Sequence, residues 1–299
     1  MLYIVNVSGG LTSFEALRRT IERHGKDSTV AVFADTKIED ADSYRFLSDQ
    51  ERYFGIEIVR LSDGRTPFQV WHDVRAITMQ SAVPCSNKLK REVIDSWIET
   101  NFDARVYTCV FGYGWDEIDR MVRITSALAP VPTWFPLSEP PYLDKCHIVN
   151  ILEGIGIKPP RLYEMGFEHN NCGGACVKAG QAHYAHLWRT LPDVYARWEA
   201  EEEAFRVYID KDVSILRDRR GGDTKPLTLK TFRGMLERGE AYDKDEWGGC
   251  GCYAPIHNLR FDALLAESAP NIGVQPTAPV AKRNSRKSSR RTSSKMRGG

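Results

Sequence analysis

The chain has 299 residues, of which 42% are hydrophobic and 27% charged, enough for one sizeable core with extensions or for two small domains. No apolar run approaches the length that crosses a bilayer, and Met1 leads directly into an apolar segment, so we expect no membrane helix and no signal peptide. Seven cysteines, an odd number, fit a reducing compartment better than a disulfide framework. The composition therefore predicts a cytoplasmic protein.

The formal net charge of +1 conceals an uneven distribution. Eight of the 41 Lys and Arg residues follow Pro270, whereas no Asp or Glu does. The remaining 33 basic residues face 40 acidic ones, so the body of the chain carries −7. The Ser-, Arg-, Lys- and Pro-rich tail, residues 270–299, is predicted to be disordered, and its charge would favour salt-dependent binding to nucleic acid. Nothing in the sequence indicates an oligomeric state.

The start of the chain combines an apolar run with a pair of glycines. The run from Leu2 to Val7 ends in Ser8, Gly9 and Gly10. Apolar residues then recur at spacings of three and four, which is typical of a helix: Leu11, Phe14, Leu17 and Ile21. The pattern predicts a strand, a tight glycine turn and a helix.

This glycine turn has the chemistry of a phosphate site. Gly9 and Gly10 can adopt backbone angles closed to other residues and let a ligand approach the main chain. The first N–H groups of the following helix lack an internal partner and lie at the positive end of its dipole, so an anion suits them. Ser8, Thr12 and Ser13 add hydroxyl donors. The alternative, an ordinary turn with Ser8 or Ser13 as the helix cap, is equally supported by this stretch.

Apolar runs alternate with amphipathic segments through the next hundred residues. Strands are predicted at 29–34, 56–61, 105–111 and 133–135, with helices beginning at Asp40 or Asp42, near Leu89 and at Ile118. This alternation predicts an α/β fold with a doubly wound, mostly parallel, Rossmann-like sheet. We expect a nucleotide-binding α/β domain over residues 1–140 and a helical region with cysteine pairs over 141–269, followed by the basic tail.

The glycine turn also resembles a known phosphate loop. Ser8-Gly9-Gly10-Leu11-Thr12-Ser13 is similar to the Ser-Gly-Gly-x-Asp-Ser loop of the adenine nucleotide α-hydrolase-like (PP-loop) superfamily, with Thr12 where aspartate is usual. Within it, the order of elements over residues 1–180 most resembles the phosphoadenylyl-sulfate (PAPS) reductase-like family. The resemblance implies that this loop holds the phosphates of ATP or a related adenine nucleotide with Mg²⁺. It also implies catalytic roles for Ser8, Thr12 and Ser13.

Two further segments extend the resemblance. Cys85 is followed by the basic residues Lys88 and Lys90, as in the corresponding loop of sulfonucleotide reductases, which implies phosphate or sulfate contacts and a catalytic role for Cys85. Gly112 and Arg120 stand where relatives have a glycine and basic residues that contact the nucleotide. The resemblance therefore implies that both bind the nucleotide. The alternative for Lys88 and Lys90 is that they lie on a solvated helix start.

Asp35 follows the predicted strand at 29–34. Because parallel strands end at one edge of a sheet, we expect Asp35 to lie beside the glycine loop. A carboxylate there could accept hydrogen bonds from a nucleotide or bind magnesium. A helix-capping role is the alternative, and the resemblance favours the nucleotide site.

The cysteines form two glycine-flanked pairs. Cys172 and Cys176 are separated by three residues, and Cys250 and Cys252 by one. Four thiolates suit a zinc ion or an iron–sulfur cluster, and small neighbours leave room for either. The alternative is four reduced thiols, some of them buried as small hydrophobic side chains. We expect the four cysteines to bind one metal or cluster.

Three functions are consistent with these features. The first, which we prefer, is an enzyme that cleaves ATP at the α-phosphate to activate a substrate for sulfur transfer or a related modification. The second is a thiol-dependent sulfonucleotide reductase, for which Cys250-Gly251-Cys252 with His257 is a loose match. The third is a non-catalytic nucleotide-binding module of a nucleic-acid-modifying assembly.

Overall fold

The computed structural model describes residues 1–78, 83–103, 106–220 and 222–248. Cys250, Cys252 and the basic tail at 270–299 lie outside the described residues, so what we expect of them stays a prediction, as do the domain boundaries. No helix within the described ranges has the length and apolarity needed to cross a bilayer.

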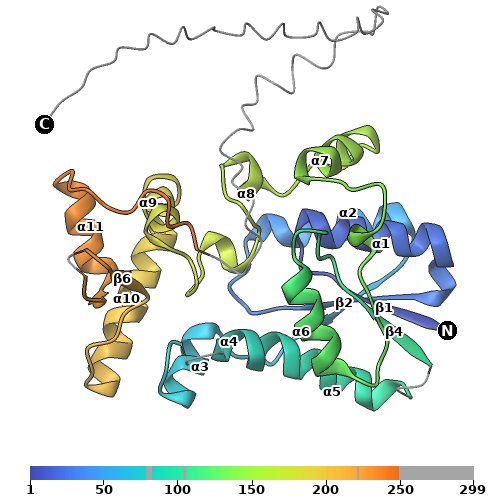
Figure 1. The fold of residues 1–299 in the computed structure, drawn as a ribbon, viewed down its shortest axis with the longest axis horizontal. Helices are drawn as coiled ribbons and strands as arrows, with labels where there is room; N and C mark the ends of the chain where they lie inside the picture. Colours follow the sequence, from blue (N-terminus) through green and yellow to red (C-terminus); the bar gives the residue numbers. More distant parts are fainter. Residues whose placement is uncertain (79–82, 104–105, 221, 249–299) are drawn as a thin grey trace, which may run out of the picture. The chain divides into compact units, whose positions relative to one another are not determined.

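A five-stranded sheet organises the first half of the chain (Figure 1). Its strands, β1 (Leu2–Asn6), β2 (Thr29–Ala34), β3 (Ile58–Leu61), β4 (Tyr107–Val110) and β5 (Thr133–Trp134), lie in the order β3-β2-β1-β4-β5. All four neighbouring pairs are parallel. The predicted α/β, doubly wound, Rossmann-like fold is confirmed.

Helices cover both faces of this sheet, as a doubly wound fold requires. On one face, α1 (Leu11–His24), α2 (Ala41–Phe54) and α7 (Lys145–Gly154) bury Phe14, Phe46 and Ile148 against the strands. On the other, α5 (Glu92–Asn101) contributes Ile98 to a core with Ile4 and Val32, which α6 (Ile118–Leu128) helps to cover. The continuous apolar strands of the sequence are therefore buried on both sides.

The ends of α2 follow local sequence rules. Asp40 is the N-cap and accepts a hydrogen bond from the Asp42 backbone N–H at 2.9 Å, and Gly55 ends the helix in the left-handed conformation. Strand β3 begins only at Ile58, two residues later than predicted, because the backbone N–H of Ile56 still bonds to Glu51 of α2.

The segment predicted as a helix around Leu89 consists of three pieces. A short α4 (Pro84–Ser86) leads into a π-helical turn, η2 (Asn87–Arg91), and then into α5. Turns of π-helix inside a helix are rare and occur most often at functional sites. Lys88 and Lys90, for which the resemblance implies phosphate or sulfate contacts, lie within this turn.

The second half of the described chain is mainly helical. Its further elements are α8 (Arg161–Glu164), η4 (Cys172–Gly174), α9 (Gln181–Thr190), α10 (Pro192–Ile209) and α11 (Leu229–Glu237), and the remaining short helices of the chain are η1 (Lys26–Ser28), α3 (Pro67–Val74) and η3 (Pro136–Ser138). Pro192 divides α9 from α10. The region 141–269, predicted to be helical, also contains the antiparallel pair β6 (Leu216–Asp218) and β7 (Lys225–Leu227).

The helical region has its own hydrophobic core, which also recruits α3 from the first half of the chain. The Phe68 and Trp71 rings of α3 lie 5.1 and 5.6 Å from the Trp198 ring of α10, in edge-to-face contacts. Trp71 is fully buried. The chain between β3 and α4 therefore binds the helical region to the sheet-containing half.

A buried carboxylate joins three elements of the helical region. Glu202 of α10 is fully buried and accepts hydrogen bonds from the backbone N–H groups of Ile215 at 2.7 Å and Leu229 at 2.6 Å. Burial raises the pKa of Glu202 to about 7, although both N–H donors favour its ionised form. The folded protein therefore holds this proton more tightly than an unfolded chain does.

This pKa predicts a specific dependence of stability on pH. Because the folded-state pKa of Glu202 lies above its usual value, its contribution is complete below about pH 4.5 and declines as the pH rises towards 7. The decline amounts to roughly 3 kcal/mol in the free energy of unfolding. In Glu202→Gln this component of the pH dependence should vanish, as measured by urea unfolding between pH 5 and 8.

Glu203→Gln serves as the matched control, because that side chain lies on the same helix but is 39% exposed. It should retain the pH dependence of the wild type. An identical pH profile for Glu202→Gln and wild type would contradict the assignment.

Candidate functional site

The glycine loop after β1 is closed by a single hydroxyl. Ser13 Oγ accepts a hydrogen bond from the Ser8 backbone N–H at 3.1 Å and donates one to the Gly10 carbonyl at 2.9 Å. Gly9 has φ +75°, a conformation that favours glycine. Gly10 is the N-cap of α1 and has no side chain with which to cap the helix. The loop therefore presents the N-terminus of a 14-residue helix, as the sequence predicts.

Gly112 lies against this loop. It follows β4, the neighbour of β1, and a Cβ placed on it would lie 2.6 Å from the carbonyl oxygen of Thr12. Only glycine allows this approach. The junction of β1 and β4 is also where successive connections turn to opposite sides of the sheet, the position at which open α/β sheets bind ligands.

The helical region reaches the loop through Tyr163. The Leu11 backbone N–H, the first in α1, donates to the Tyr163 hydroxyl at 3.3 Å. A Cβ on Gly10 would lie 3.0 Å from the same hydroxyl. Gly10 has φ −101°, which any residue can adopt, so a side chain at this position is opposed by the Tyr163 hydroxyl and not by the backbone conformation.

Asn170 makes a second contact with the loop. Its Nδ2 donates to the Gly9 carbonyl at 2.8 Å and to Ser43 Oγ at 2.9 Å. Asn170 and Ser43 are each 1% exposed. The loop is thus held from its buried side by an amide that lies 161 residues away in the sequence.

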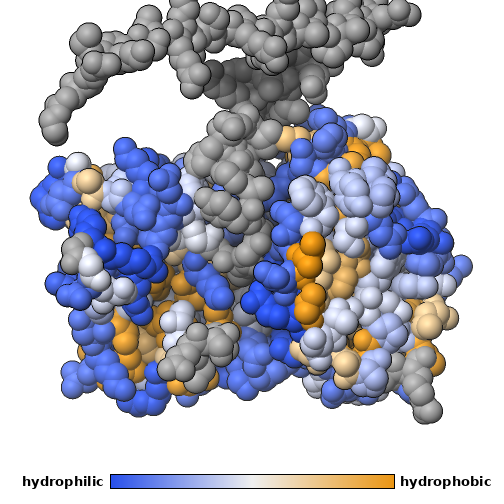
Figure 2. Space-filling model, in the orientation of Figure 1, coloured by the Kyte–Doolittle hydropathy of each residue, from blue (hydrophilic) through white to orange (hydrophobic). Residues whose placement is uncertain are grey.

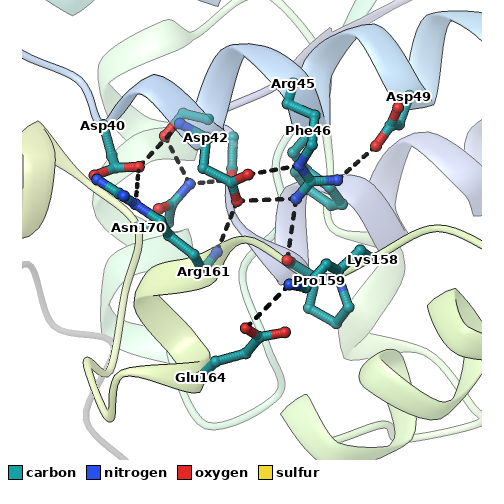
Figure 3. Close-up of polar contacts among 12 residues, drawn as sticks. Asp40, Asp42, Arg45, Phe46, Asp49, Lys158, Pro159, Arg161, Glu164 and Asn170 are labelled. Atoms are coloured by element: carbon teal, nitrogen blue, oxygen red, sulfur yellow. Dashed lines mark hydrogen bonds and ion pairs between the residues drawn. The ribbon is translucent and has the colours of Figure 1, made fainter.

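Ion pairs anchor the segment that carries both contacts (Figure 3). Arg161 of α8 forms a bidentate pair with Asp40 at 2.8 and 2.7 Å, and its backbone N–H donates to Asp42. Arg45 pairs with Asp42 and donates to the Pro159 carbonyl. The Arg45 guanidinium and the Arg161 N–H hold the pKa of Asp42 below its usual value against the effect of burial. The N-terminus of α2 therefore fixes α8 next to the loop.

Asp35 lies at the carboxyl end of β2, next to β1, as predicted. Its carboxylate accepts hydrogen bonds from Tyr44 Oη and the Lys37 backbone N–H, at 2.9 and 2.8 Å. Burial raises the pKa of Asp35, but the hydrogen bonds from Lys37 and Tyr44 outweigh it, so the net shift is downward. Asp35 is consequently an ionised carboxylate at the carboxyl edge of the sheet.

The basic residues of the π-helical turn diverge. Lys88 pairs with Glu92 at 2.8 Å and borders a shallow hollow beyond β3, two strands away from the loop. Lys90 points inwards, with Nζ 3.6 Å from Glu39 Oε1. The Glu39 side chain is 1% exposed and its other oxygen accepts from the Cys172 backbone N–H at 2.7 Å. Lys90, and not Lys88, is therefore connected to the cysteine loop.

Arg120 lies in an aromatic group at the end of β4. Its guanidinium is 4.2 Å from the Tyr113 ring centroid and 2.8 Å from Glu117. The rings of Phe111, Tyr113 and Phe135 stack at 5.7 to 6.0 Å. Figure 2 shows an apolar strip over the adjoining α6. On this helix Ile118 and Val122 are 63% and 60% exposed.

Three predicted site cysteines belong to one hydrophobic core. Cys176 is buried in the core of the helical region, and Cys172 and Cys85 pack against it. Cys172 has φ 50°, and the following Gly173 also has a positive φ, so this loop turns sharply. Within the described residues there is no group of three or more His, Cys, Asp or Glu side chains placed to hold a metal. Cys250 and Cys252 are not among them.

The chain leading to the second cysteine pair passes the first. Gly248, two residues before Cys250, forms an antiparallel bridge with Ala179, three residues after Cys176. The Gly180 backbone N–H donates to the Trp247 carbonyl at 2.8 Å. The main chain that follows the first pair is therefore in contact with the main chain that precedes the second.

Two buried histidines accompany this region. The rings of His169 and His183 stack at 5.5 Å. Burial lowers the pKa of His169 to about 3 and that of His183 to about 4, and nearby lysines contribute for His169. Both are neutral at pH 7. His183 Nε2 lies 2.7 Å from the Gly174 carbonyl and therefore carries the proton.

Sequence reasoning missed the residues that hold the glycine loop and the cysteine loop from outside. Tyr163, Asn170 and Glu39 had no predicted role, although Asn170 lies beside the cysteine motif. No periodicity or spacing relates residues 9 and 170. The polar run Glu168-His169-Asn170 before Cys172, which the structure buries, was the one available indication.

Comparison with known proteins gives limited relationships. No family model matches the chain. An uncharacterised protein of Methanocaldococcus jannaschii is 27% identical over 218 residues, which cover 70% of this chain and 42% of the relative. The chain thus spans about two fifths of that relative's length. Among solved structures, the PAPS reductase of Candida auris, in a phosphate complex, superposes with a TM-score of 0.41 and 10% identity over 56% of this chain and 79% of that one.

The contact between Gly10 and Tyr163 can be tested by a double-mutant cycle. Gly10→Ala should destabilise the protein by about 1 kcal/mol, because its methyl group displaces the Tyr163 hydroxyl. Tyr163→Phe should cost a similar amount alone but add little in the Gly10→Ala background. Thermal and urea unfolding of the four proteins would measure this coupling.

Additive effects of the two substitutions would contradict the contact. Tyr142→Phe is the matched control, since Tyr142 is 57% exposed. Its effect should be small and independent of residue 10.

Proposed function

We propose that this protein binds ATP, or a related adenine nucleotide, with its phosphates on the glycine loop, and cleaves ATP at the α-phosphate. The observation that carries this is the loop geometry. Ser13 closes the turn, Gly112 packs against its backbone, and the N-terminus of α1, whose first N–H is bonded to Tyr163, lies at the β1–β4 junction. Backbone N–H groups and a helix dipole at such a junction favour a phosphate chain.

In the proposed reaction an acceptor oxygen or sulfur attacks the α-phosphorus of ATP. The bond from the α-phosphorus to the bridging oxygen breaks, and pyrophosphate leaves with the electron pair while the acceptor is adenylylated. The N–H groups at the start of α1 and the hydroxyls of Ser8 and Thr12 would neutralise charge that develops on the leaving pyrophosphate. The acceptor's proton passes to solvent.

Mg²⁺ fits this site as the accompanying cation. Asp35 is an ionised carboxylate at the same edge of the sheet, and carboxylate oxygens are ligands that Mg²⁺ prefers. When bound, Mg²⁺ would supply neutralisation of the phosphate charges. Of the basic residues that the resemblance implies, Arg120 lies beyond the end of β4, the strand next to β1. Lys88 lies farther away, beyond β3.

We further propose that Cys172 and Cys176, with Cys250 and Cys252, hold a zinc ion or an iron–sulfur cluster. Two observations support this. The first pair lies in a sharp, glycine-containing loop, and the bridge between Ala179 and Gly248 brings the chain to within two residues of Cys250. The described residues contain two of the four proposed ligands, and the thiolates of Cys250 and Cys252 would complete the set.

The nucleotide reaction predicts defined products. With Mg²⁺ and a nucleophilic acceptor such as hydroxylamine, ATP should yield pyrophosphate with AMP or an adenylyl adduct, detectable by anion-exchange chromatography. Ser13→Ala should weaken ATP binding about tenfold by calorimetry, because the loop loses the hydrogen bonds that close it. Release of ADP and orthophosphate alone would overturn the proposed bond cleavage.

Thr20→Val is the control for Ser13→Ala. Thr20 is a buried residue of the same helix whose hydroxyl donates to the Ala16 carbonyl, away from the loop. Loss of the Thr20 hydroxyl should lower the free energy of unfolding and leave ATP affinity unchanged. Equal ATP affinities for Ser13→Ala and wild type would contradict the role of the loop.

The metal proposal has a separate readout. Protein purified without oxygen should contain about one zinc ion or one iron–sulfur cluster per chain, measured by elemental analysis and visible absorption. A Cys172→Ser, Cys176→Ser double variant should lose it, whereas Cys146→Ser should retain it. Wild-type protein without zinc or iron, or a double variant that keeps its metal, would rule the site out.

A further inference from the structure

We propose that Asn170 is a positioning residue of the nucleotide site: it holds the Gly9–Gly10 peptide in the orientation that directs the Gly10 N–H at a bound phosphate. This inference rests on the proposed function, because it names a residue outside the loop on which phosphate binding depends. Asn170 itself does not touch the nucleotide. The argument begins with the orientation of one peptide plane.

Asn170 determines where the Gly9 carbonyl points. Asn170 Nδ2 lies 2.8 Å from that oxygen, and both Asn170 and its other partner, Ser43, are buried. Gly9 has φ +75°, a region in which glycine is free to rotate its peptide. A loop with this freedom needs an external contact to select one orientation, and the Asn170 amide supplies it.

Fixing the carbonyl also fixes the next N–H. A trans peptide is planar, and its C=O and N–H point in opposite directions. Because the Gly9 carbonyl faces the buried amide of Asn170, the Gly10 N–H faces the opposite side, away from Asn170 and Ser43. It thereby joins the N–H groups of the first turn of α1, which is where an anion binds.

The oxygen of the Asn170 amide argues against a role in packing alone. Its Oδ1 is buried and has no hydrogen-bond partner among the described residues. A buried acceptor without a donor is costly, and a residue chosen only for packing would avoid it. What this side chain provides is its donor group, and that group is used on the loop.

The chain before and after Asn170 is fixed by contacts with residues at the start of α2. The Cys172 backbone N–H donates to the buried Glu39 at 2.7 Å, and Arg161 of α8 pairs with Asp40. Figure 3 shows Asn170 next to Asp40, Asp42 and Arg161 at the start of α2. Since Ser43 belongs to that same helix, the amide is fixed relative to the loop and can impose an orientation on it.

The experiment compares two ligands and three variants at one pH. Affinities for ATP and for adenosine, which has no phosphate, are measured by calorimetry for wild type, Asn170→Ala and the isosteric Asn170→Asp. Both variants lose the amide donor, so ATP affinity should fall at least about tenfold while adenosine affinity changes less than about twofold. Ser43→Ala, which leaves the bond to Gly9 in place, is the matched control and should bind both ligands as wild type does.

The outcomes separate this inference from the proposed function. If wild type does not bind ATP, the nucleotide site itself is wrong. If wild type binds ATP and the Asn170 variants bind it equally well, or lose ATP and adenosine affinity in parallel, the positioning role is wrong. Should Asn170→Ala fail to fold, Asn170→Asp retains the side-chain volume and decides the question through the same ratio of ATP to adenosine affinity.

Discussion

The orientation of the glycine loop depends on contacts from residues far away in the sequence. Gly9 is bonded by Asn170 and the first N–H of α1 by Tyr163, so the loop after β1 is completed by residues more than 150 positions later. A flexible turn with two adjacent glycines loses much entropy when it is ordered. Those contacts, together with Ser13, offset that cost and make the loop a defined surface.

Buried polar groups hold the two halves of the protein together. Asp40 pairs with Arg161, and the buried Glu39 links Thr36, Lys90 and the Cys172 backbone. Such groups are costly to bury unless every partner is in place, so they specify one arrangement where apolar packing alone would allow several. The result is that the glycine loop, the π-helical turn and the cysteine loop are connected through the N-terminal end of α2.

Much of the fold follows from local rules. The apolar strands and the cap at Asp40 are set by residues close to one another in the chain, which is why they could be predicted. The location of Asp35 at the carboxyl edge of the sheet followed from parallel topology, whereas Gly112 was implied by the family resemblance. The pair β6–β7 was missed because short polar strands have weak periodicity. Lys88 and Lys90 lie two residues apart in the motif but have different partners, because the π-helical turn η2 directs their side chains apart.

By itself, the sequence determined the class of fold, the strand–glycine–helix unit and the carboxyl edge where a ligand would bind. All of these depend on hydrophobic period and on the conformational preferences of single residues. Only the tertiary structure decided that the Tyr163 hydroxyl lies against Gly10 and that Asn170 holds Gly9. Contacts between residues so far apart in the chain leave no local pattern, because they depend on how α8 and the cysteine loop fold back onto α2.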